Sequence, residues 1–202
     1  MQYIFEKVPL PTEIRGGAIF IWNDAFPQWK EVIAAAEKES SDPDSGVSFD
    51  IAKTADGDWK GKRRNRVLWL TTLAQQGNEP LKRINNQVMI TFQNYLNHYA
   101  HYFETSFTEH EPYSLLKYSG SSNDHYDAHY DGGPSTGRWI SAIIYLNDDY
   151  EGGEIEFPDH LTKVKPKAGT LMIFPSNYAY RHIAHNVTSG TKYAIVTWIN
   201  GF

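Results

Sequence analysis

Short runs rich in Tyr, Ile, Val, Phe and Trp follow one another after residue 110, and Gly, Asn, Asp and Pro separate them. They are the segments 112–118, 125–131, 138–147, 153–158, 161–166, 170–175, 182–187 and 192–199. β-Branched and aromatic runs bounded by turn residues are typical of strands. About eight strands at close spacing, with no helix between them, predict an antiparallel jelly roll or barrel.

The chain before residue 110 has a different pattern. We expect strands at 17–22 and 66–73, a helix over about 26–39 capped by Asn23 or Asp24, and a helix over 80–103 that Pro80 opens. Apolar residues recur at steps of three and four through the second helix: Leu81, Ile84, Val88, Phe92, Tyr95, Tyr99 and Tyr102. We therefore predict a mostly β, α+β fold in a single domain, 1–202. Its jelly-roll core, a double-stranded β-helix, is expected at 111–202, with helices from the supporting region 1–110 packed on one sheet.

Composition excludes several classes of protein. The 202 residues carry a net charge of −5, and the one basic cluster, 60–66, is expected to be a solvated approach to a strand. A nucleic-acid-binding surface needs more positive charge on one face. The absence of Cys rules out disulfides and thiolate metal sites. No apolar run reaches the length of a membrane span, and we expect no secretory signal at the start of the chain. We expect a soluble, cytoplasmic monomer or homodimer that binds neither nucleic acid nor membrane.

Two H-x-D patterns are candidates for a metal site, His125 with Asp127 and His129 with Asp131. Residues i and i+2 of a strand point to the same face, so either pair could bind one ion from a single strand. A His from a distant strand, such as His182, would complete a set of two His and one carboxylate, which suits non-haem Fe(II) with open coordination positions. Two His and one Asp alone do not exclude Zn.

Four ordered segments carry a family resemblance: YDAHYD at 126–131, YLNDDYEGGEIEFP at 145–158, KPKAGTLMIFPS at 165–176 and HIAHNVTSGTKYAIVTW at 182–198. Together they make the region 112–202 resemble the prolyl 4-hydroxylase group of Fe(II)/2-oxoglutarate-dependent dioxygenases. In that family the first metal His follows an aromatic residue by three and precedes the Asp by two, and the distal His lies ten residues before a basic residue. The resemblance thus implies the metal ligands His129, Asp131 and His182, and leaves His125 and His185 outside the metal site.

The resemblance also implies the residues that hold 2-oxoglutarate. Lys192 matches the family's anchor for the distal carboxylate, and Tyr145 and Tyr118 resemble phenols that hydrogen-bond the same group. Arg138 and Trp198 match residues on the substrate side. Strand alternation places Lys192, Ala194, Val196 and Trp198 on one face. It sets Arg138 opposite Tyr145, so Arg138 reaches the site only if its strand kinks at the start.

The implied reaction couples oxidative decarboxylation of 2-oxoglutarate by O2 to hydroxylation of an unactivated C–H bond, with ascorbate as a candidate reductant. The leading expectation is a hydroxylase of prolyl residues in a peptide or protein. The alternatives are the same chemistry on a free amino acid or nucleic acid, and a jelly-roll module that binds a metal without catalysis. The segments 41–62, with Trp59, and 132–137 are candidate loops at the site entrance, and Gly152-Gly153 is expected in a tight turn.

Overall fold

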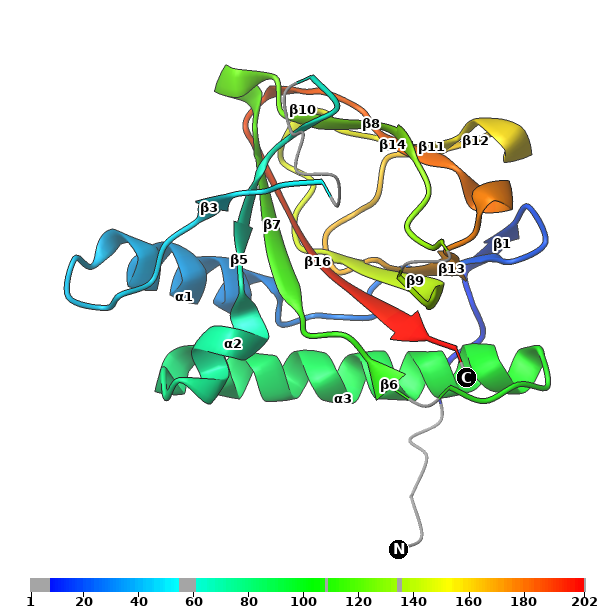
Figure 1. Ribbon diagram of the computed structural model, residues 1–202, viewed down its shortest axis with the longest axis horizontal. Coiled ribbons are helices and arrows are strands. Elements are labelled where there is room, and N and C mark those ends of the chain that lie inside the picture. Colours follow the sequence, from blue (N-terminus) through cyan, green and yellow to red (C-terminus); the bar gives the residue numbers. More distant parts are fainter. Residues whose placement is uncertain (1–7, 55–60, 108, 134–135, 202) are drawn as a thin grey trace, which may run out of the picture.

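Two antiparallel β-sheets face each other in a computed structural model that describes residues 8–54, 61–107, 109–133 and 136–201. Figure 1 shows helix α3 (Glu79–Tyr102) beneath the larger sheet and the strands of the smaller sheet on the opposite side. The arrangement is the predicted jelly-roll core with helices packed on one sheet.

The larger sheet supplies the side of the core that contacts the helices. Its strands follow the order β1 (Glu13–Arg15), β2 (Ile19–Trp22), β13 (Leu171–Pro175), β9 (Arg138–Tyr145), β16 (Thr191–Asn200), β7 (Ser114–Ser119), β5 (Arg66–Leu68) and β3 (Asp50–Ile51), and β6 (Glu109–His110) pairs with β16. The smaller sheet follows the order β12 (Thr162–Val164), β11 (Ile155–Phe157), β14 (His182–Ala184), β8 (His125–His129) and β4 (Arg63–Arg64). Strands β10 (Glu151–Gly152) and β15 (Val187–Ser189) form a separate pair.

Helix α3 covers the outer face of the larger sheet with an apolar stripe. The stripe consists of Leu81, Ile84, Val88, Phe92, Leu96, Tyr99 and Ala100, all of which are buried. All of them except Ala100 share one core cluster with Phe20, Leu115 and Ile195, whose strands are far apart in the sequence. Asn78 caps the start of the helix, because its side chain accepts a hydrogen bond from the Leu81 N–H at 3.0 Å.

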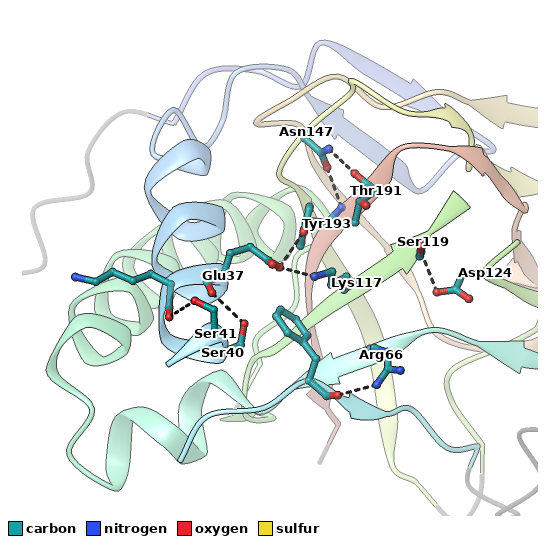
Figure 2. Close-up of polar contacts among 12 residues, drawn as sticks. Glu37, Ser40, Ser41, Arg66, Lys117, Ser119, Asp124, Asn147, Thr191 and Tyr193 are labelled. Atoms are coloured by element: carbon teal, nitrogen blue, oxygen red, sulfur yellow. Dashed lines mark hydrogen bonds and ion pairs between the residues drawn. The ribbon is translucent and has the colours of Figure 1, made fainter. Parts of the chain in front are cut away.

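Helix α1 (Trp29–Ser41) packs on the same face through Val32 and Ala36. Its Glu37 carboxylate accepts hydrogen bonds from Lys117 of β7 and Tyr193 of β16, which Figure 2 shows side by side. One helical side chain therefore bridges two neighbouring strands of the larger sheet.

The strands predicted after residue 110 are present within a few residues of their expected bounds, except that the run at 182–187 is divided between β14 and β15, which belong to different sheets. The strand predicted at 66–73 was wrong beyond Leu68, because helix α2 (Leu70–Gln75) follows β5 directly. Leu70 and Ala74 are buried four residues apart, which is a helical spacing. The predicted caps of α1 were also wrong: the helix begins after Gln28, and no side chain caps it.

Short 3-10 turns, Gly120–Ser122, Pro158–His160 and Tyr178–Tyr180, connect strands of the core. Among the helices that the structure describes, none has an apolar stretch long enough for a bilayer crossing.

Candidate metal centre and the cavity beside it

A cavity of about 690 Å³ opens between the two sheets. The larger sheet contributes the inward-facing residues of β7, β9 and β16, and the smaller sheet contributes residues of β8, β11 and β14. The predicted alternation on β16 is confirmed, because Lys192, Ala194, Val196 and Trp198 all line this space.

Three potential metal ligands meet at one end of the cavity. His129 ends β8 and lies opposite His182, the first residue of β14, while Asp131 follows two residues after His129. Asp131 Oδ1 lies 3.6 Å from His129 Nε2, and Asp131 Oδ2 lies 3.7 Å from His182 Nε2. One ligand atom from each of the three residues falls within 4.8 Å of the others, a separation from which all three can reach one ion.

Hydrogen bonds orient each of these three side chains. The Nδ1 atoms of His129 and His182 lie 2.6 Å and 3.1 Å from the backbone oxygens of Asp127 and Tyr180. Because a carbonyl only accepts, each Nδ1 carries the proton, and each Nε2 presents its lone pair to the centre. Asp131 Oδ2 accepts a hydrogen bond from Ser141 at 2.7 Å.

The pKa values at this centre favour unprotonated ligand atoms. Burial, and then the neighbouring His182, lower the pKa of His129, so its imidazole is neutral at physiological pH. Burial alone would raise the pKa of Asp131, but the two imidazoles and the Ser141 hydrogen bond outweigh it and hold that pKa below its usual range. A buried carboxylate beside two imidazole lone pairs fits a divalent cation, and the donor set is the one that non-haem Fe(II) takes.

The alternative His and Asp residues lie elsewhere. His125 Nδ1 is 3.0 Å from the Asn123 carbonyl oxygen, and the Asp127 side chain is 58% exposed. His185 Nε2 is 2.6 Å from a Glu156 carboxylate oxygen. The structure thus brings together the three residues that the resemblance selects and separates them from the second H-x-D pattern.

Lys192 lies in the same cavity without a matching negative charge. Its side chain is buried, and its ammonium donates a hydrogen bond to the Gly153 carbonyl at 2.6 Å. The ring centroids of Tyr145, Tyr118 and Tyr150 lie 5.2, 5.4 and 5.9 Å from Nζ. No carboxylate among the described residues pairs with Lys192 within 4.0 Å. Burial, and then the nearby Lys165, lower the pKa of Lys192 to about 7.

Tyr118 and Tyr145 form buried walls of the cavity beside this ammonium. Burial raises the pKa of Tyr118 to about 12 and that of Tyr145 well above its ordinary value. Both side chains therefore remain neutral phenols that can donate a hydrogen bond to an anion.

Arg138 does reach the cavity, because its strand is irregular at the predicted position. The pairing of β9 with β16 shifts register between Ile199 and Asn200, opposite the start of β9. The Arg138 guanidinium then lies 3.6 Å from the centroid of the Trp198 ring and pairs with both carboxylate oxygens of Glu111 at 2.6 Å. Arg138 and Trp198 thus form one stacked unit in the cavity wall.

Sequence reasoning missed Ser141, Glu111 and Arg63. Arg63 belongs to the basic cluster expected to be solvated, yet it lines the cavity and lies 4.8 Å from the ring centroid of Tyr126. Tyr126 in turn stacks on His129 with centroids 3.4 Å apart. No local pattern marks these residues, because each acts through a partner far away in the sequence.

Both candidate entrance loops reach the cavity in their described parts. Ala52, Lys53 and Thr54 of the first loop line it, as do Gly132, Gly133 and Thr136 of the second. Residues 55–60, which include Trp59, and residues 134–135 lie outside the described part of the chain. Gly152 and Gly153 adopt φ values of 68° and 66°, as the predicted tight turn requires.

Comparisons with known proteins agree with this geometry. Residues 113–200 match the family model described as 2OG-Fe(II) oxygenase superfamily, where 2OG is 2-oxoglutarate. Human prolyl 3-hydroxylase 2 is 38% identical over 68 residues, which is 31% of this chain and 10% of that protein. The chain thus spans only about a tenth of the length of the prolyl 3-hydroxylases that it matches.

Two solved structures share the fold over most of the chain. A prolyl hydroxylase from Trichoplax adhaerens, in complex with a hypoxia-inducible factor peptide fragment, has a TM-score of 0.72 and 21% identity, and the match covers 92% of this chain and 84% of that one. The 2OG complex of the viral collagen prolyl hydroxylase from Paramecium Bursaria Chlorella virus-1 has a TM-score of 0.67 and 22% identity, with coverages of 93% and 98%. The chain is thus similar in sequence to the 2OG-Fe(II) oxygenase superfamily over residues 113–200, and it shares the fold of these two prolyl hydroxylases.

Proposed function

We propose that this protein is an Fe(II)- and 2-oxoglutarate-dependent dioxygenase that hydroxylates prolyl residues of a peptide or protein. The observation that supports this most is the charge arrangement of one cavity. A buried carboxylate and two imidazole lone pairs lie at one end, and a buried ammonium that pairs with no carboxylate of the described residues lies within the same walls. Such a cavity suits a cation and a dianion bound together.

His129, Asp131 and His182 would hold the iron. When bound, the iron supplies the activation of O2 that couples decarboxylation of 2-oxoglutarate, to succinate and CO2, with insertion of one oxygen atom into a C–H bond. The chain's own contribution at this end is orientation. The backbone carbonyls at Asp127 and Tyr180 and the Ser141 hydroxyl fix the three side chains before any ligand arrives.

Lys192 would bind the distal carboxylate of 2-oxoglutarate. A buried ammonium is costly without a counter-charge, and the carboxylate supplies one. Tyr118 and Tyr145 remain protonated in this environment, so each can donate its hydroxyl hydrogen to the same anion. A metal bound only for structural reasons would need no such anion pocket, which favours catalysis over a non-catalytic binding module.

The proposal of a prolyl substrate rests on the relatives and on aromatic surface at the cavity. Prolyl hydroxylases occur among the sequence relatives and the structural neighbours, and one neighbour is in complex with a peptide. Trp69 and Tyr130 line the cavity while half exposed, at 50% and 52%. Flat aromatic side chains provide favourable contact surfaces for proline-rich segments.

The experiment is an assay of 2-oxoglutarate turnover with Fe(II), O2 and ascorbate, in which succinate release and substrate mass are measured together. We expect proline-containing peptides to gain one oxygen atom and to accelerate succinate release. A gain of oxygen on free proline or on single-stranded nucleic acid instead would keep the chemistry and replace the substrate. No succinate above the level of a His182→Ala control under any of these conditions would contradict the enzyme assignment.

We also propose that the described residues act as one domain, with 1–110 supporting 111–202. Residues from both regions, such as Phe92 and Ile195, share one buried cluster. Thermal unfolding should then show one cooperative transition by both near-UV and far-UV circular dichroism. Two separate transitions would contradict the proposal.

A further inference from the structure

We propose that Glu37 and Asn147 are positioning residues that hold Lys192 for the co-substrate, acting from the side of the sheet that faces away from the cavity. The inference rests on the proposed function, in which Lys192 binds 2-oxoglutarate. Neither Glu37 nor Asn147 lines the cavity. Figure 2 shows Asn147 beside Thr191 and Tyr193 of β16, and Glu37 beside Tyr193.

Asn147 forms hydrogen bonds with the backbone on both sides of Lys192. Its amide nitrogen donates to the Thr191 carbonyl at 2.7 Å, and its amide oxygen accepts from the Tyr193 N–H at 2.8 Å. These are the residues immediately before and after Lys192. Asn147 is itself buried, so the two hydrogen bonds are protected from water.

Glu37 holds the same segment through side chains. One carboxylate oxygen, Oε1, lies 2.7 Å from Lys117 Nζ and 2.8 Å from the Tyr193 hydroxyl. Lys117 pairs with Tyr193 across the two strands, and the next pair along is Tyr118 with Lys192. Because side chains alternate between faces, the pair that Glu37 fixes points away from the cavity and the adjacent pair points into it.

The first residues of β16 need this support more than the middle of the strand does. β9 ends at Tyr145, which pairs with Ala194, so the regular β9 ladder stops before it reaches Lys192. Beyond Leu146, the side chain of Asn147 replaces the backbone of the neighbouring strand. Strand ends fray unless other groups hold them, and a displaced backbone here would move the ammonium relative to Tyr118 and Tyr145.

The test is calorimetric titration of 2-oxoglutarate into protein loaded with Mn(II), a probe that does not turn over. Glu37→Gln removes the charge of a side chain that is 40% exposed, so the fold should be retained. We expect the Kd for 2-oxoglutarate to rise about threefold, the effect of losing one partly exposed charged contact. The Kd for Mn(II) should not change. Glu79→Gln, which removes the charge of another helical pair, with Lys82, is the matched control and should leave both constants unchanged.

A double-mutant cycle with Lys192→Ala separates positioning from general stability. If Glu37 acts through Lys192, Glu37→Gln has no effect on 2-oxoglutarate binding once Lys192 is gone. Tyr193→Phe, which deletes only the hydroxyl that donates to Glu37, should reproduce part of the effect and serves if Glu37→Gln does not fold.

The outcomes distinguish this inference from the proposed function. An unchanged Kd in Glu37→Gln, or an equal effect in the Lys192→Ala background, would overturn the positioning role while wild-type binding of 2-oxoglutarate still stood. Absence of 2-oxoglutarate binding to the Mn(II)-loaded wild type would overturn the proposed function, and the positioning role with it.

Discussion

The two ends of the cavity are built in opposite ways. The end at His129, Asp131 and His182 has an excess of electron donors, each fixed by a hydrogen bond to a neighbouring backbone or side-chain group. The end at Lys192 has an excess of positive charge, held by a single backbone carbonyl and surrounded by tyrosine rings. One end is suited to a cation and the other to an anion.

The difference shows how the fold prepares for its ligands. Short cross-strand distances at the first end bring three side chains to one point, so the proposed metal would be selected by the geometry of its ligands. Burial at the second end makes the free ammonium unfavourable, so we propose that an anion would bind there by relieving this electrostatic cost.

The largest effect is expected from loss of a proposed metal ligand. His182→Ala should lower turnover by about a thousandfold or more, because two remaining donors bind a divalent ion weakly. Succinate release measures this change, and His185→Ala is the matched control, because His185 contacts Glu156 outside the cavity. Loss of activity in His185→Ala with activity retained in His182→Ala would reverse our assignment of the ligands.

The second effect concerns the charged end. Lys192→Met should raise the KM for 2-oxoglutarate about a hundredfold, since a buried charge-assisted contact contributes about 1.5–3 kcal/mol. The measurement is the dependence of succinate release on 2-oxoglutarate concentration. An unchanged KM would place the carboxylate anchor at another residue.

The same substitution should stabilise the fold without ligands. A buried ammonium with a pKa near 7 resists burial, so its replacement by an apolar side chain of similar length should raise stability by about 1 kcal/mol. The gain should be largest below pH 7, where the folded protein carries the charge, and should decline as the pH approaches the ordinary lysine pKa. Chemical denaturation at pH 6 and pH 9 tests the sign, and a less stable variant at both pH values would contradict it.

A smaller loss of ligand binding than that of Lys192→Met is expected from the group that orients Asp131. Ser141→Ala removes the hydroxyl that donates to Asp131 at 2.7 Å and should weaken Mn(II) binding about tenfold. Calorimetric titration with Mn(II) provides the measurement. Thr136→Ser, which keeps a hydroxyl elsewhere on the cavity wall, should bind Mn(II) as the wild type does.

The smallest predicted effect is the pH dependence of 2-oxoglutarate binding. Because the Lys192 ammonium loses its proton near pH 7 in the free protein, affinity should fall about threefold between pH 6.5 and pH 7.5. Lys192→Arg, which stays charged across this range, should bind with little change. Equal pH dependence in the two proteins would assign the titration to another group.

The sequence predicted the core strands and the long helix well because both depend on local pattern. The apolar stripe of α3 and the alternation of β16 can be read from residue spacing alone. The prediction of a strand at 66–73 was wrong because the apolar residues Val67, Leu68 and Leu70 fit either a strand or a helix. Packing in the core cluster shared with α3 favours the helix from Leu70 onward.

Several contacts in and around the site could not be predicted from the sequence. Glu37 and Asn147 contact Tyr193 from 156 and 46 residues away, and Glu111 pairs with Arg138 from 27 residues away. Such contacts exist only after folding and leave no periodic signal. Arg138 was correctly tied to a kink in its strand, but the kink itself, at the register shift between Ile199 and Asn200, required coordinates.

We propose that one ligand, 2-oxoglutarate, spans the cavity from the metal centre to Lys192. The most direct test compares 2-oxoglutarate with 2-oxobutyrate, which lacks the distal carboxylate, as ligands of the Mn(II)-loaded wild type and of Lys192→Met. We predict that the wild type binds 2-oxoglutarate about a hundredfold more tightly and that Lys192→Met shows almost no preference. A preference that survives in Lys192→Met would contradict the claim.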